Sequence, residues 1–258
     1  MATLTHIFRY PVKGLSPEPL DQVDLAEGRA LPFDRAFALA RPGGTVDPDN
    51  PRWARKANFL CLMLDEQLAQ VRTEFNPGTR RLVVWQDGAP VLVGHVDLPP
   101  GRRAIEGFFH NLLGSNLPAP PRFVAAEDGE FMDSQDRTVS LINLATVRAL
   151  EAKWGRGLDL RRFRANLYMD GLEPWAEHQW IGATLAIGGA RCFVDRRNPR
   201  CAATNVDPVT AQRDMDIPRA LMESFGHRDL GLNLHVRAGG RVTVGDPVTV
   251  VAETAVAG

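Results

Sequence analysis

A cysteine preceded by an arginine is the residue in this sequence best suited to chemistry. Cys201 stands in Arg200-Cys201-Ala202-Ala203-Thr204-Asn205-Val206-Asp207-Pro208, a segment that follows Asn198-Pro199. Positive surroundings favour the thiolate form of a cysteine, which binds metals and attacks electrophiles. Cysteines are more often buried in the core, but prolines at both ends of this segment favour a loop. The sequence therefore predicts a local site for an anionic ligand, with Cys201 as the ligating or reactive residue.

The other two cysteines fit structural roles. Cys192 alternates with polar residues in Ala190–Val194, and Cys61 lies in the apolar run Phe59–Leu62, so we expect both in the core. Three cysteines without a CxxC pair form neither a disulfide scaffold nor a zinc motif. Together with the absence of a signal-peptide pattern in the first 15 residues, this predicts a cytoplasmic protein.

Composition argues against a charged macromolecular partner. The 258 residues carry a formal net charge of −1, and no apolar run approaches the length of a membrane span, so we expect neither nucleic acid nor membrane as a partner. The basic residues are 27 arginines against three lysines, Lys13, Lys56 and Lys153, a bias that a GC-rich genome would explain. Arginine still matters physically, because its planar fork can bind phosphate or carboxylate through two hydrogen bonds.

The elements expected to position this chemistry differ between the two halves. Most of the first 100 residues alternate like strands, and Asp87-Gly88 is a strong hairpin signal. Residues 104–113 have helical spacing, and the proline-rich segment 117–121 resembles a linker. We therefore place a domain boundary there, giving domains of residues 1–121 and 122–258.

The second half mixes helices with strands. We expect helices over 140–154 and 217–225, a strand over 163–169, a hairpin across Gly188-Gly189, and strands over 232–236 and 241–251. The pattern predicts a β-rich α+β protein rather than alternating βαβ units. The sequence contains no GxGxxG, P-loop, GxSxG or HExxH motif.

Five separated segments together resemble one family. They are Tyr10–Gly14, Asp34-Arg35, Phe163–Asn166, Arg200–Pro208 and Val244–Val248. The last three segments resemble the MOSC family, named for the C-terminal domain of molybdenum cofactor sulfurases, and the first two resemble its companion N-terminal β-barrel domain. The resemblance implies an N-terminal β-barrel-like domain followed by a MOSC β-barrel with interspersed helices.

The resemblance also implies a cofactor and the residues that hold it. It implies that the molybdenum cofactor, molybdopterin, is bound and that Cys201 ligates the molybdenum and is catalytic. The cofactor-binding residues that match the family's motifs are Lys13, Arg164, Asn166, Arg200, Thr204 and Asp207. Structural alternatives remain open: Asp207-Pro208 would end a strand, Arg164 would pair with a carboxylate, and Asp34-Arg35 would serve the fold.

Three functions are compatible with such a site. The amidoxime-reducing branch of the family implies an oxidoreductase that reduces small N-hydroxylated compounds. Four cysteines would be needed for a fused plant-type iron–sulfur domain, so its electrons would come from a separate donor protein. The alternatives are a molybdenum cofactor carrier and a sulfur-transfer protein that uses the same cysteine. Gly14 stands where amidoxime-reducing members often have serine, which leaves these alternatives open.

Overall fold

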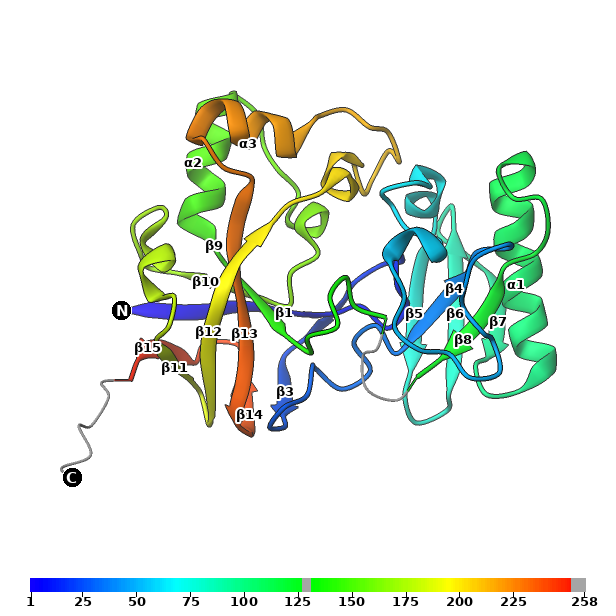
Figure 1. Cartoon of the computed structure of the whole chain (residues 1–258), viewed down its shortest axis with the longest axis horizontal. Helices are drawn as coiled ribbons and strands as arrows, with labels where there is room; N and C mark the ends of the chain where they lie inside the picture. Colours follow the sequence, from blue (N-terminus) through cyan, green and yellow to red (C-terminus); the bar gives the residue numbers. More distant parts are fainter. Residues whose placement is uncertain (127–130, 252–258) are drawn as a thin grey trace.

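A closed barrel of seven strands forms the left part of the molecule in Figure 1. The structure is a computed structural model that describes residues 1–126 and 131–251. Around the barrel the strands follow the order β10-β9-β13-β12-β11-β15-β1, and β1 pairs again with β10. Their bounds are β1 Ala2–Arg9, β9 Val139–Asn143, β10 Leu167–Asp170, β11 Thr184–Ile187, β12 Ala190–Pro199, β13 Asp229–Ala238 and β15 Pro247–Val250.

Alternating side chains fill this barrel. Every second residue of β12 is buried from Ala190 to Val194, which places Cys192 inside, with none of its surface exposed, as the sequence predicted. The hairpin across Gly188-Gly189 is confirmed, because β11 and β12 pair antiparallel. Strand β2 (Glu18–Leu20) extends the barrel sheet by pairing with β1, whereas β3 (Gln22–Leu25) and β14 (Gly240–Thr243) form a separate two-stranded sheet.

Two helices lie at one end of the barrel, at the top left of Figure 1. They are α2 (Leu144–Trp154) and α3 (Ile217–Phe225), and α3 has the bounds predicted from the sequence. The predicted start of the first helix at Ser140 is wrong: β9 continues to Asn143, whose side chain accepts a hydrogen bond from the Ala145 amide and so caps α2. Short 3₁₀ turns connect these elements, at η4 (Leu160–Phe163), η5 (Ala176–Trp180) and η6 (Ala202–Asn205).

The N-terminal part combines small sheets with one long helix, at the right of Figure 1. Its elements are β4 (Phe37–Ala40), η1 (Lys56–Asn58), η2 (Glu66–Gln70), β5 (Arg72–Asn76), β6 (Arg81–Gln86), β7 (Ala89–His95), α1 (Pro99–Leu113), η3 (Gly114–Asn116) and β8 (Arg122–Ala125). The predicted hairpin is confirmed between β6 and β7, where Asp87 and Gly88 both have positive φ. Phe37, Phe75 and Phe123 pack together beneath these strands.

The β-rich α+β class expected from the sequence is confirmed. The boundary after residue 121 stays a prediction, and residues 127–130 and 252–258 of the predicted second domain lie outside the described residues. Strands β1 and β3 precede that boundary, yet they pair with strands that follow it. Among the described residues, none of the helices combines the length and apolar character needed to cross a membrane.

Candidate functional site

A cavity of about 410 Å³ is lined by residues of both the N-terminal part and the barrel. Seven basic side chains line it: Lys13, Arg35, Lys56, Arg162, Arg164, Arg196 and Arg200. In the described part of the chain, Asp133 is the single acidic residue of this lining. The cavity therefore has a large positive surplus, which favours an anionic ligand.

Cys201 lines this cavity directly after β12. Its side chain is partly exposed, and its backbone is held on both sides, because the Thr204 amide and hydroxyl donate to its carbonyl at 3.0 and 2.9 Å. Before it, the Arg200 amide donates to the Arg228 carbonyl at 2.8 Å. The thiol is thus presented to the cavity from a fixed turn, η6.

Two lysines share one carboxylate in this cavity. Lys13, only 5% exposed, donates from Nζ to the Asp133 carboxylate at 2.6 Å and to the Phe131 carbonyl at 2.8 Å. Lys56 Nζ lies 3.4 Å from the other oxygen of Asp133. Burial works against the charged form of Lys56, but neighbouring Asp133 and Cys201 raise its pKa, so Lys56 is a cation at neutral pH.

Arg200 lines the cavity but is occupied by the fold. Its Nε and Nη2 donate to the Leu230 carbonyl, and its Nη1 donates to the Phe163 carbonyl at 2.9 Å. Burial lowers its pKa to about 10, so it remains a cation at neutral pH. Its guanidinium therefore joins β13 to η4 behind the cavity.

Arg164 lines the cavity with a guanidinium that makes a single hydrogen bond to the described residues. Its φ of 51° follows η4, and its Nη1 donates to the Leu15 carbonyl at 2.6 Å. Arg35 crowds it: both guanidinium groups lie over the Tyr10 ring, at 4.5 Å for Arg164 and 4.3 Å for Arg35. Burial and the repulsion from Arg35 lower the pKa of Arg164 to about 10.

Arg35 has Asp34 as an ion-pair partner, whereas no carboxylate of the described residues pairs with Arg164. The alternative in which Arg164 pairs with a carboxylate is therefore wrong for the described residues. A half-buried cation without a counter-charge is unfavourable, so this position favours an anion.

Asn166 and Thr204 lie at the cavity wall with their polar atoms used internally. The Asn166 amide oxygen accepts from the amide and hydroxyl of Ser140 at 3.2 and 2.9 Å, and its nitrogen donates to the Phe8 carbonyl at 3.2 Å. Thr204 donates to Cys201. Both residues therefore shape the wall of the cavity. Asn166 joins β1 and β9 just before β10 begins, and Thr204 fixes the turn that follows Cys201.

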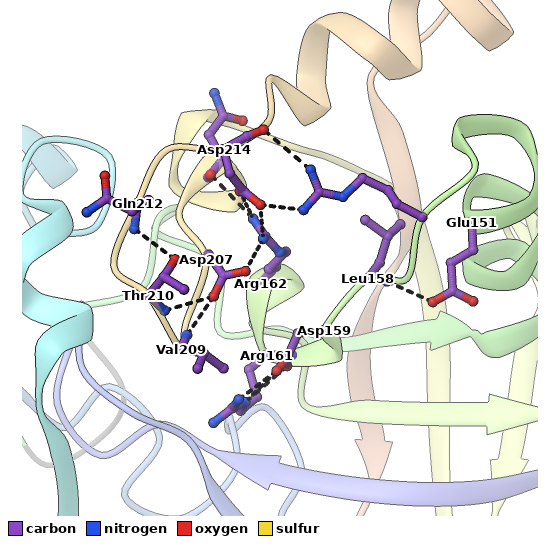
Figure 2. Close-up of polar contacts among 12 residues, drawn as sticks. Glu151, Leu158, Asp159, Arg161, Arg162, Asp207, Val209, Thr210, Gln212 and Asp214 are labelled. Carbon is purple, nitrogen blue, oxygen red and sulfur yellow. Dashed lines mark hydrogen bonds and ion pairs between the residues drawn. The ribbon is translucent and has the colours of Figure 1, made fainter. Parts of the chain in front are cut away.

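Asp207 is the one predicted site residue that is absent from the cavity lining. Figure 2 shows its surroundings: one oxygen accepts from the Val209 and Thr210 amides at 2.8 and 3.0 Å, and the other lies 2.5 Å from Arg162 Nη2. Arg162, 3% exposed, also pairs with Asp214 at 2.8 Å. Asp207 therefore does not contact the cavity itself but binds Arg162, which lines it.

Several lining residues were missed from the sequence. These are Arg35, Lys56, Asp133, Arg162 and Arg196. One available signal was the rarity of lysine, because two of the three lysines line the cavity. Cys61 was expected in the apolar core. It is buried, with 6% of its surface exposed, but it lines this cavity.

Gly14 explains one departure from the family pattern. Its φ is +83°, and a β-carbon there would lie 2.8 Å from the Leu60 carbonyl and 3.1 Å from Cys61 Cα. The backbone after Lys13 therefore requires glycine, whatever chemistry a serine would offer.

A second cavity of about 260 Å³ adjoins the first, and the two share Gly14, Leu62 and Arg164 in their linings. The second is lined by apolar side chains such as Leu15, Leu68 and Trp85 and by charged ones such as Arg72 and Arg161. Arg164 thus stands between the thiol-bearing cavity and a second, smaller one.

The donor set fits a metal that arrives with its own organic ligand. Within residues 1–126 and 131–251, no group of three His, Cys, Asp or Glu side chains is placed to hold a metal ion. The first cavity offers one thiol and a cationic wall, and its volume lies within the range of small-molecule sites, about 300–1,000 Å³. A thiolate suits a metal already bound by sulfur, and guanidinium groups suit phosphate.

Solved structures that resemble the chain do so at low identity. YuaD from Bacillus subtilis is 13% identical over 96% of this chain and 94% of that one, with a TM-score of 0.44. YiiM from Geobacillus stearothermophilus is 19% identical over 46% and 56%, with a TM-score of 0.36. YiiM from Escherichia coli is 18% identical over 45% and 55%, with a TM-score of 0.33. The chain thus spans just over half of the length of the YiiM proteins.

A comparison with curated proteins found no match. A family model does match: the MOSC domain model aligns with residues 128–249, the stretch that contains Cys201 and most of the barrel strands. This chain therefore carries, over residues 128–249, a MOSC domain, a member of a family associated with the molybdenum cofactor.

Proposed function

We propose that this protein binds the molybdenum cofactor in the larger cavity and reduces small N-hydroxylated compounds there. The observation that carries the proposal is the position of Cys201: a thiol held in a fixed turn lines a cavity whose described lining has seven basic side chains and one carboxylate. A thiolate that ligates a metal and a cationic wall that attracts phosphate are the two features the cofactor needs.

The chain's own residues would divide the work of binding. Cys201 would ligate the metal, and Arg164, with donors left over after its bond to Leu15, would contact the anionic part of the cofactor. Lys13 and Lys56 would add charge from the opposite wall, with Asp133 moderating them. Arg200, Asn166, Thr204 and Asp207 would act by holding the backbone and side chains of this wall in place.

The bound cofactor would supply a redox centre that accepts electrons singly and passes them to a substrate. Cleavage of an N–O bond releases the oxygen as water and consumes electrons from a separate donor protein and protons from solvent. The second cavity supports a small-molecule substrate, because Arg164 lines both cavities and Leu15, Leu68 and Trp85 can contact an apolar group. The cavities would also keep bulk water away from the reacting bond.

The decisive experiment measures molybdenum and pterin in the purified full-length protein. We expect both at near-stoichiometric levels, and we expect Cys201→Ser to lose the metal on dialysis while its circular dichroism spectrum stays unchanged. Cys192→Ala is the matched control: it removes a thiol from the barrel interior, lowers stability by about 1–2 kcal/mol, and keeps the cofactor. Full molybdenum retention by Cys201→Ser would refute the assignment.

A carrier or a sulfur-transfer protein could use the same cysteine, and the same samples separate these functions. Reduction of an N-hydroxylated substrate with an artificial electron donor favours the reductase. Molybdenum and pterin without any turnover favour a carrier, and a persulfide on Cys201 in molybdenum-free protein favours sulfur transfer.

A further inference from the structure

The loop that carries Cys201 turns back on itself after the cysteine. Residues 206–213 form a tight hairpin-like turn in which Asp207 and Gln212 pair through their backbones at 2.8 Å, and Val206 and Arg213 form an isolated β-bridge. The positive φ of Ala211, 56°, lets the chain reverse within it. This turn brings Arg213 back beside the start of the loop, within reach of Ala202.

Arg213 joins this loop to the N-terminal part of the protein. Its Nη1 donates to the Ala202 carbonyl at 3.1 Å, and its Nη2 donates to the Leu62 and Met63 carbonyls at 2.9 and 3.0 Å. Its Nε lies 3.2 Å from the Glu66 carboxylate. The Arg213 guanidinium therefore binds the carbonyl of Ala202, the residue after Cys201, and the carbonyl of Leu62, the residue after Cys61.

The other anchors of the loop act from the barrel side. Arg162 binds Asp207, Asp214 and the Asn205 carbonyl, as Figure 2 shows in part. Within the described residues, the hydrogen bonds between residues 201–216 and residues 61–66 are all donated by Arg213. At this point, the hydrogen bonds between the two walls of the larger cavity therefore come from a single side chain among the described residues.

We propose that Arg213 is a positioning residue that sets where the Cys201 thiol lies in the cavity. It does so by fixing the Cys201 loop against the segment Leu62–Met63, so that the N-terminal part controls the geometry of a cysteine in the barrel. The inference rests on the proposed function only in taking Cys201 as the working thiol. The contacts to backbone carbonyls carry the effect, because the ion pair to Glu66 is partly exposed, at 32% and 38% of the two side chains, and contributes little.

The test is thiol alkylation of the full-length protein by iodoacetamide, with each cysteine followed separately by peptide mass spectrometry. Cys192 is the internal reference, because it is fully buried in the barrel and reacts only when the barrel opens. A general loss of stability would instead speed the alkylation of both cysteines together. We expect Arg213→Met to speed alkylation of Cys201 by about tenfold relative to Cys192, because several charge-assisted hydrogen bonds are lost.

Three further variants sharpen the test. Arg213→Lys should restore part of the protection, because an ammonium can bind one or two of the carbonyls. Glu66→Gln should resemble the wild type. Arg148→Met is the control: it likewise removes a guanidinium that joins two segments, through hydrogen bonds to Asp170 at 2.8 and 2.6 Å, but Asp170 is in β10, outside the cavity lining.

The results separate this inference from the proposed function, since alkylation requires no bound cofactor. An unchanged Cys201:Cys192 ratio in Arg213→Met would overturn the positioning role, even if the wild type holds molybdenum. A raised ratio in a protein without molybdenum would keep the positioning role and reject the proposed function. A Glu66→Gln variant as reactive as Arg213→Met would overturn the assignment to the backbone carbonyls.

Discussion

Arg164 and Arg200 line the same cavity with the same charge, but their nitrogen atoms have different partners. Arg200 spends its donors on the Leu230 and Phe163 carbonyls, whereas Arg164 contacts one carbonyl and has no carboxylate partner within the described residues. The first residue is therefore expected to serve mainly stability, and the second mainly the ligand.

Substitution by lysine should separate these roles. Arg200→Lys should lower the free energy of unfolding by about 1–3 kcal/mol, because a buried carbonyl is left without its donor. Arg164→Lys should weaken cofactor retention by about one order of magnitude, because an ammonium cannot reproduce the two-pronged contact to an anion. Urea unfolding and metal content after dialysis measure the two effects.

The control for both substitutions is Arg219→Lys, whose side chain is exposed on α3 and pairs with Glu223. It should change neither quantity. A stable Arg200→Lys variant that loses the cofactor would reverse the division of roles.

His178 should make stability depend on pH. It is 9% exposed, its Nε2 has no hydrogen-bond partner, and the rings of Trp175 and His227 lie 5.4 and 5.6 Å away. Burial, followed by the charges of Arg197 and His227, lowers its pKa to about 4, although Asp229 opposes the shift. The unfolded chain therefore binds this proton at a higher pH than the folded protein does.

Stability from this group is complete above about pH 6.5 and falls as the pH drops toward 4, by up to about 3 kcal/mol. His178→Gln should flatten this dependence between pH 7 and 5, as measured by urea unfolding. His6→Gln, at an exposed position on β1, is the control. An identical pH dependence in wild type and His178→Gln would contradict the prediction.

At the residue scale, the motif around Cys201 made it possible to predict a thiol in a basic setting, because the residue types stand side by side in the sequence. The difference between Arg164 and Arg200 could not be predicted, because it depends on which carbonyls of η4, β13 and the loop after β1 face each guanidinium. Lys56 was missed for the same reason, because it comes to the cavity from a distant segment of ordinary composition. Arg35 stands in a family-like segment, but the sequence favoured a role in the fold for it.

Among the elements, the loop of residues 201–216 depends on the pairing of Arg162 with Asp207 and Asp214. Arg162 is almost completely buried, so its charge needs both carboxylates. Arg156 adds a further contact to Asp214, at 2.5 Å. These contacts explain why a segment of irregular backbone can hold a cysteine in place.

Asp214→Asn should lower the free energy of unfolding by about 1–3 kcal/mol, because the buried Arg162 loses one of its two charged partners. The matched control is Asp170→Asn, which breaks the exposed pair with Arg148 and should cost less than about 1 kcal/mol. Equal effects of the two variants in urea unfolding would show that the Arg162 cluster adds nothing to stability.

Element types were easier to predict than their partners. The helix over 217–225 and both hairpins could be predicted, because caps, glycines and periodicity are local signals. The start of α2 was misplaced, because an apolar run cannot distinguish the end of β9 from the first helical turn. That β1 completes the barrel could not be predicted, because its pairing with β10 and β15 joins opposite parts of the sequence.

For the whole molecule, this pairing makes the two predicted domains interdependent. Residues 122–258 alone lack β1, so β10 and β15 would be left as open edges of an incomplete barrel. We expect this fragment to aggregate or to unfold without a cooperative transition, as followed by circular dichroism. Cooperative unfolding by the isolated fragment would contradict the prediction.

The control protein keeps β1 in the barrel but is cleaved between the two predicted domains. A protease site inserted among the exposed residues Pro118–Pro120 should yield two fragments that stay associated during size-exclusion chromatography, because β1 remains in the barrel. Spontaneous separation of the fragments in native buffer would mean that β1 contributes little to holding them together.

Strand β1 also has a consequence for the order in which the protein is made. Its residues Ala2 and Thr3 pair with Val248 and Pro247, so β1 is made long before one of its neighbours in the barrel. Barrel closure is therefore a contact of very high sequence separation, which slows folding. Until then β1 has a free edge that other chains could join, so the growing chain should depend on chaperones to remain unaggregated.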